Sequence, residues 1–129
     1  MTSDEYSKSL QYIQTKVVDA RNAGTSKKEI NDLKAEMEFD LNIEYFLGSD
    51  FSADRRQLLR DVHRSMRQSL MLAIGRSVRG ETSPVLHDTE VRSITKIMVN
   101  DFANILSPEE LKSFVGRHAE SSSDTFDYS

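Results

Sequence analysis

The sequence contains no cysteine and no tryptophan, and it has only two prolines and five glycines among its 129 residues. Without cysteine there is no disulfide scaffold, no thiolate nucleophile and no cysteine-ligated zinc or iron–sulfur site. The sequence also lacks a run of about 18 apolar residues and an apolar segment near its first residues. We therefore expect a cytoplasmic protein that does not span a membrane.

A chain of this length can bury a hydrophobic core without a metal ion or a disulfide to hold it together. We expect a single helical domain over residues 1–119, followed by a disordered acidic tail over residues 120–129. The tail places Phe126 and Tyr128 among acids and serines. This composition is typical of a solubilising terminus, with a short docking peptide as the alternative.

The few glycines and prolines lie where helices are expected to begin or end. Apolar residues at spacings of three and four predict helices over about 4–23, 26–47 and 52–80, a fourth from about residue 87 and a short fifth after Ser107. Gly24, Gly48 and Gly80 are expected to end the first three helices. The residues expected to be buried include Tyr6, Leu10, Ile13, Val17, Ile30, Leu33, Met37, Leu41, Val91, Ile94, Met98, Phe102, Ile105, Leu111, Phe114 and Val115. The predicted fold class is all-α, an antiparallel bundle of four main helices plus a short C-terminal fifth helix.

The third predicted helix has an apolar stripe that curls around its axis. Its large apolar residues recur every four positions, and such a stripe drifts by about 40° per step because the helix has about 3.6 residues per turn. The C-terminal half of the stripe is therefore expected to meet a different neighbour from the N-terminal half. The drifting residues are Leu58, Val62, Met66, Leu70, Ile74 and Val78. We predict a homodimer whose interface contains Leu70, Met71, Ile74 and Val78.

Positive charge is concentrated in the same helix. Seven of the ten arginines lie between Arg55 and Arg79, and residues 52–80 carry seven bases and two acids. Residues 1–51 carry six bases and ten acids, and residues 81–129 carry four and nine. Such segregation indicates either pairing within the protein or a surface for an acidic partner.

Four of these arginines form a stripe on the predicted helix, namely Arg56, Arg60, Arg64 and Arg67. Three interpretations are open for this stripe. It can pair internally with Glu29, Asp32, Glu36 and Asp40 on the second helix, it can bind an acidic protein, or it can bind nucleic-acid phosphates. We favour a small regulatory or adaptor protein without catalytic activity, which binds a protein partner or itself.

Residues 54–74 around His63 resemble a known helix. The run Asp54-Arg55-Arg56-Gln57-Leu58-Leu59-Arg60-Asp61-Val62-His63, followed by Gln68-Ser69-Leu70, is similar to the phosphoacceptor helix of histidine-kinase dimerisation and histidine-phosphotransfer domains. The resemblance implies that His63 is the phosphoacceptor of a signalling module. Arg64 stands where the family has an acid that orients the histidine, and Arg67 stands where it has a glycine. We therefore expect that His63 does not carry phosphate, and phosphotransfer remains an alternative function.

Neither a metal nor a cofactor is expected. No Glu-x-x-His pair precedes His63, His87 or His118, and the five glycines are isolated, so no phosphate-binding loop is predicted. The acids have no spacing that identifies a general acid and base. We predict a protein that is not an enzyme.

Overall fold

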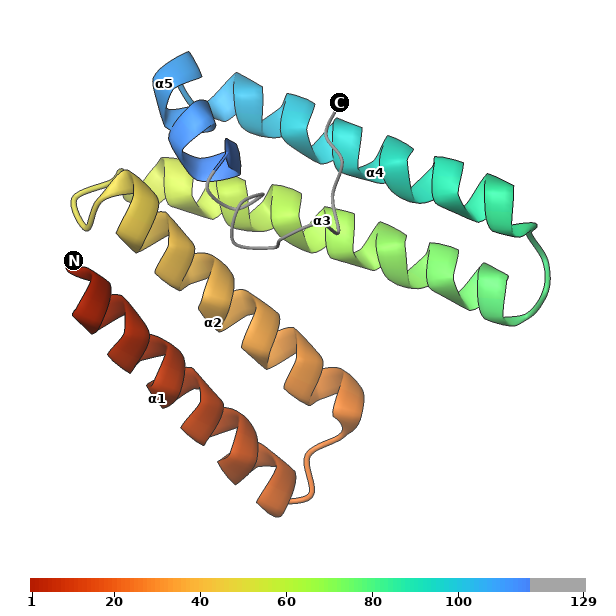
Figure 1. Cartoon of the computed structure of the whole chain (residues 1–129), viewed down its shortest axis with the longest axis horizontal. Coiled ribbons are helices and arrows are strands. Elements are labelled where there is room, and N and C mark those ends of the chain that lie inside the picture. Colours follow the sequence, from red (N-terminus) through yellow and green to blue (C-terminus); the bar gives the residue numbers. More distant parts are fainter. Residues whose placement is uncertain (117–129) are drawn as a thin grey trace. The chain divides into compact units, whose positions relative to one another are not determined.

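The structure is a computed structural model in which residues 1–116 are described. Within this range the chain is helical and contains no strand. The helices are α1 (Ser3–Asn22), α2 (Lys27–Leu47), α3 (Ala53–Val78), α4 (Pro84–Ile105) and the short α5 (Pro108–Leu111), which continues into the π-helical turn η1 (Lys112–Gly116). The all-α prediction is confirmed (Figure 1). The predicted tail, residues 120–129, lies outside the described residues.

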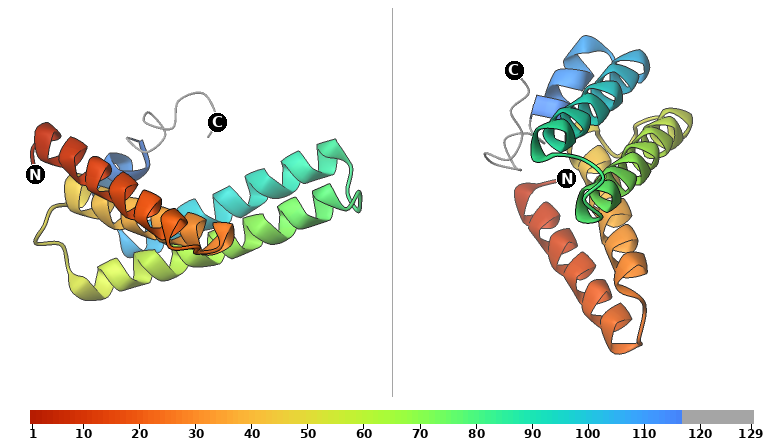
Figure 2. Two further views of the ribbon diagram at one scale, coloured as in Figure 1. Left: turned by 90° about the horizontal axis from the view of Figure 1, so that it is seen from below. Right: turned by 90° about the vertical axis from the view of Figure 1, so that its right-hand side faces the viewer.

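The helices divide into two compact units. The first, Met1–Ser52, is a hairpin of α1 and α2, and the second, Ala53–Gly116, contains α3, α4, α5 and η1. In each unit two long helices run side by side in opposite directions (Figure 2). Short connections between consecutive helices are typical of such antiparallel neighbours. The single domain expected over 1–119 remains a prediction.

The first unit closes around four buried aliphatic side chains. Ile13 and Val17 of α1 pack with Ile30 and Leu41 of α2. Beside this core, the hydroxyl of Tyr6 donates a hydrogen bond to Oδ1 of the buried Asn42 at 2.8 Å. Tyr6 also stacks on Tyr45, with ring centroids 4.4 Å apart. Burial of the phenol raises the pKa of Tyr6, and the nearby Glu38 adds to the rise.

The predicted helix ends are largely confirmed. Gly24, Gly48 and Gly80 follow α1, α2 and α3 with φ values of 81°, 101° and 72°, a region that other residues rarely adopt. Ser26 caps α2, because its hydroxyl accepts a hydrogen bond from the backbone N–H of Glu29.

The predicted start of α4 near residue 87 is wrong. The helix begins at Pro84, and the hydroxyl of Ser83 caps it by accepting a hydrogen bond from the N–H of Leu86. The predicted helices leave residues 81–86 as a loop, and this segment contains Pro84. At the first position of a helix, however, proline loses no intrahelical hydrogen bond and its fixed φ suits the helix.

Burial differs from the predicted stripes at several positions. Leu10 and Leu33 are exposed, and in α3 Leu58 is exposed while its neighbour Leu59 is fully buried. The drift of the α3 stripe explains this pattern, since its middle residues lie toward α4, where Val62 and Met66 line a groove between the two helices. The ends of the stripe therefore rotate out to opposite sides.

The structure contains no candidate for a membrane span within residues 1–116, because no helix there is both long and apolar enough to cross a bilayer.

Candidate interaction surface

The four arginines of the predicted stripe lie on one side of α3. At about 100° per residue they occupy an arc of about 80°, and this arc lies about 135° around the helix from the residues that face α4. Arg64 is exposed and the other three are half-buried. We call this side the basic arc, and it consists of Arg56, Arg60, Arg64 and Arg67.

The local sequence supports a regular helix under the basic arc. Arginine, glutamine, leucine and methionine are good helix formers, and α3 contains no proline. Gln57 Nε2 donates a hydrogen bond to Asp61 Oδ1 at 2.9 Å, and Arg60 Nη1 donates to Gln57 Oε1 at 3.5 Å. Asp54 lies in the first turn and Arg76 in the last, where each charge opposes the helix dipole.

The other three arginines of this segment are held by acids of the same unit. Arg79 makes a two-pronged ion pair with Glu81, at 3.1 and 3.0 Å. Arg76 of α3 pairs with Glu90 of α4. Arg55 pairs with Glu110 of α5. Arg55 and Arg76 thus connect α3 to α5 and α4, Arg79 pairs within the turn that follows α3, and the other four arginines share the basic arc.

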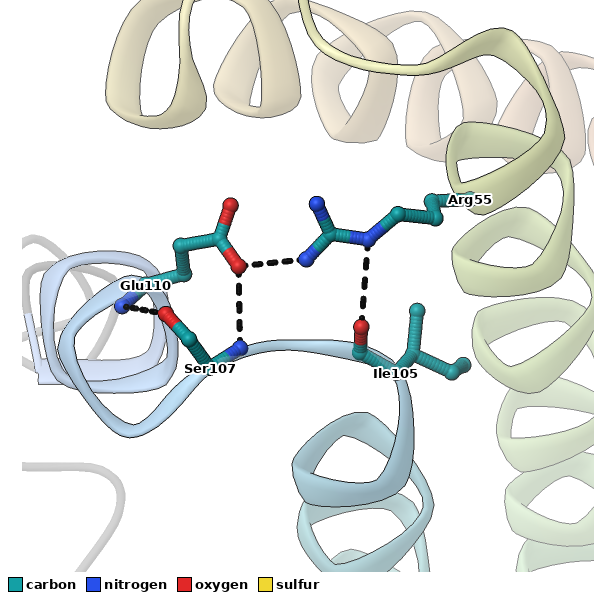
Figure 3. Close-up of polar contacts among 4 residues, drawn as sticks. All are labelled: Arg55, Ile105, Ser107 and Glu110. Atoms are coloured by element: carbon teal, nitrogen blue, oxygen red, sulfur yellow. Dashed lines mark hydrogen bonds and ion pairs between the residues drawn. The ribbon is translucent and has the colours of Figure 1, made fainter.

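The Arg55 pair fixes the junction between α4 and α5 (Figure 3). Arg55 Nε donates to the carbonyl oxygen of Ile105 at 3.2 Å, and Nη2 donates to Glu110 Oε1. The same carboxylate accepts from the N–H of Ser107 at 2.9 Å, while the Ser107 hydroxyl accepts from the N–H of Glu110. The hydrogen bond from Arg55 lowers the pKa of Glu110, and the bond from the Ser107 backbone lowers it further.

Sequence reasoning found half of this junction. The helix start at Ser107-Pro108-Glu109-Glu110 is confirmed, with both hydrogen bonds of a capping box. The role of Arg55 was missed, because its partner is 55 positions away and nothing in the local spacing distinguishes Arg55 from the arginines of the basic arc.

The basic arc continues toward the end of α3 as an apolar surface. Met71, Ile74 and Val78 lie within the same range of angles, and they are 47%, 52% and 81% exposed. Leu70, the fourth residue of the predicted dimer interface, lies at the edge of this surface and is half-buried. We call Met71, Ile74 and Val78 the apolar arc. One side of α3 is thus basic in its first half and apolar in its second.

His63 is half-buried at the edge of the basic arc, with Arg64 as its neighbour in the chain. Over residues 1–116 no group of three or more histidine or acidic side chains is arranged to hold a metal ion. The basic arc thus offers cations, which bind a partner by charge. The apolar arc offers aliphatic side chains, which bind a partner by becoming buried.

Comparison of this chain with protein-family models, with curated proteins and with solved structures finds no match.

Proposed function

We propose that this is a non-catalytic cytoplasmic adaptor or regulatory protein that binds an acidic protein surface through the basic arc. The observation that supports this proposal is the clustering of four arginines on one side of α3. Arg56, Arg60, Arg64 and Arg67 share one side of α3 that faces away from α4, in a segment with seven bases and only two acids. Arginine is enriched at protein interfaces because its planar head binds carboxylates through two hydrogen bonds.

The test compares two charge reversals of equal size in the full chain. Tagged wild type, Arg64→Glu and Arg92→Glu proteins are used for affinity capture from the native host, followed by quantitative mass spectrometry. Arg92 lies on α4 and pairs locally with Asp88, so it is the matched control. We expect proteins with acidic surfaces to be captured by wild type and by the control but lost with Arg64→Glu. Equal capture by all three would refute the proposal.

Two competing roles of the basic arc give different results. If the arc binds nucleic acid, a labelled duplex should bind with an affinity that falls steeply with salt, with a log–log slope of about −0.9 per phosphate contact. If it pairs internally with α2, Arg60→Glu should lower the unfolding midpoint and Glu36→Arg in the same chain should partly restore it. Our proposal expects neither salt-dependent duplex binding nor rescue by the second substitution.

We further propose that the protein forms a homodimer through the apolar arc and Leu70. Three exposed aliphatic side chains next to one another favour burial, which is worth about 1.5 to 3 kcal/mol for each side chain that becomes fully buried. We also propose that the two hairpins of one chain form the antiparallel bundle of four main helices that the sequence predicts.

A further inference from the structure

A second surface lies on another side of the α3–α4 hairpin. It is a groove of about 60 Å³ between the two helices. Its lining on α3 lies more than 100° around the helix from the centre of the basic arc. The groove is lined by Val62, Ser65, Met66 and Ser69 of α3 and by Ile97, Met98 and Asp101 among the residues of α4.

The size of the groove decides what can occupy it. Pockets for small molecules usually measure about 300 to 1,000 Å³, several times the volume of this groove. It can accept the end of one aliphatic side chain. Ser65 and Ser69 are small and leave the space, and Met66 and Met98 are flexible enough to adapt to what enters.

The rim of the groove extends this apolar surface along the hairpin. Leu58 and Leu72 of α3 are 51% and 65% exposed, and Leu86 and Ile97 of α4 are 62% and 59% exposed. On α3 the residues on this side are spaced by four, three, four and three, namely Leu58, Val62, Ser65, Ser69 and Leu72. This spacing is typical of a helix that packs lengthwise against another helix. The groove and its rim therefore fit a third helix.

The charges in and around the groove indicate the chemistry of that helix. Asp101 lines the groove, and within residues 1–116 no ion pair involves it. The arginines on this side of α3, Arg76 and Arg79, are already paired with Glu90 and Glu81. In a symmetric dimer this side would face the same side of a second copy, which would cover Asp101 without supplying a spare cation, and a covered, unpaired carboxylate is costly. A partner with its own lysine or arginine avoids that cost.

We propose that this groove binds an amphipathic helix of another protein, which inserts an aliphatic side chain between Ser65 and Ser69 and places a lysine or arginine next to Asp101. This surface is independent of the basic arc. The groove selects a partner with a basic residue, whereas the basic arc selects an acidic partner.

The experiment is a selection from a display library of helical peptides on the immobilised full-length protein, followed by fluorescence anisotropy with the enriched peptides. We expect aliphatic residues at spacings of three and four with a basic residue toward one end. Ser69→Leu fills the groove and should weaken binding by about tenfold or more. Asp101→Asn keeps the shape and should weaken binding by about three- to tenfold.

Matched variants separate the groove from other surfaces. Glu109→Gln removes an exposed acid outside the groove, and Ile74→Glu changes the apolar arc, so both should leave peptide affinity unchanged. Replacing the basic residue of the peptide by glutamine should remove the dependence on Asp101. Circular dichroism checks that each variant is folded. If Ser69→Leu does not fold, Asp101→Asn still tests the proposal.

Three outcomes would overturn the proposal. The first is that no peptide is enriched, or that the enriched peptides lack a basic residue. The second is that they bind Ser69→Leu or Asp101→Asn as tightly as wild type. The third is that light scattering shows a dimer that Ser69→Leu converts to a monomer, which would mean that a second copy fills the groove.

Discussion

Replacing Glu110 by glutamine should destabilise the α3–α5 unit, and the loss should disappear in acid. The carboxylate of Glu110 accepts hydrogen bonds from Arg55 Nη2 and from the N–H of Ser107. Glutamine keeps an oxygen that can accept from Ser107, because glutamine also serves in a capping box. The substitution therefore removes the charge while it leaves the helix start largely intact.

The expected magnitude follows from the exposure of the pair. The side chains of Arg55 and Glu110 are 36% and 30% exposed, so solvent screens the interaction in part. Exposed pairs contribute about 0.2 to 1 kcal/mol, and Arg55 also has a second bond to Ile105 that holds it in place. We expect a loss of about 0.5 to 1 kcal/mol, which corresponds to a decrease in melting temperature of about 2 to 8 °C for a unit of this size.

The dependence on pH gives the sign of the effect. Because the folded-state pKa of Glu110 is lowered, the ionised carboxylate stabilises the fold at neutral pH. This contribution is complete above the ordinary carboxyl pKa and is lost as the pH falls through the lowered value. The difference between wild type and Glu110→Gln should therefore be full at neutral pH and should vanish in strong acid.

Thermal unfolding followed by circular dichroism at both pH values tests this reasoning, with Glu109→Gln as the control for removing an exposed acid. An Arg55→Ala, Glu110→Gln double variant should lose less than the sum of the two single losses. The reasoning is refuted if Glu110→Gln is as destabilising in acid as at neutral pH, or if the two losses add.

Three further predictions concern other sites. Ile74→Glu should shift the mass measured by light scattering at tens of micromolar from dimer toward monomer, whereas Ile97→Glu should not; a wild-type monomer would contradict the dimer. Tyr6→Phe should lower stability in urea by about 1 to 2 kcal/mol, because the buried Asn42 loses its hydrogen bond, and Tyr12→Phe at an exposed position should have no effect. His63→Gln should leave partner binding unchanged, and no acid-labile phosphate should form with host kinases or response regulators; a label that disappears in His63→Gln would restore phosphotransfer.

The sequence predicted the helices well because their ends are decided locally. Each of Gly24, Gly48 and Gly80 takes a conformation that other residues disfavour, and the serine caps satisfy N–H groups three residues away. The start of α4 at Pro84 was missed, since proline has opposite effects at the first turn and inside a helix.

Burial was harder to predict because it depends on which side of each helix its neighbour occupies. Leu58 and Leu59 illustrate this, since they are equally apolar and adjacent in the chain, yet Leu58 is exposed and Leu59 is buried. The candidate surfaces show the same limit. The spacing placed the four arginines on one arc, but the groove exists only because α4 places Ile97 and Asp101 opposite Ser65 and Ser69.

The pairing of helices that are neighbours in the chain has a consequence for how the protein is made. The α1–α2 hairpin contains its own core within the first 52 residues, so the side chains of this core are all available before α3 has been synthesised. Short loops make closure of each hairpin inexpensive in entropy, and proteins with such local topology fold in microseconds to milliseconds. Translation proceeds at about 5 to 20 residues per second. Each hairpin therefore has time to form as it leaves the ribosome, before the next hairpin has been synthesised.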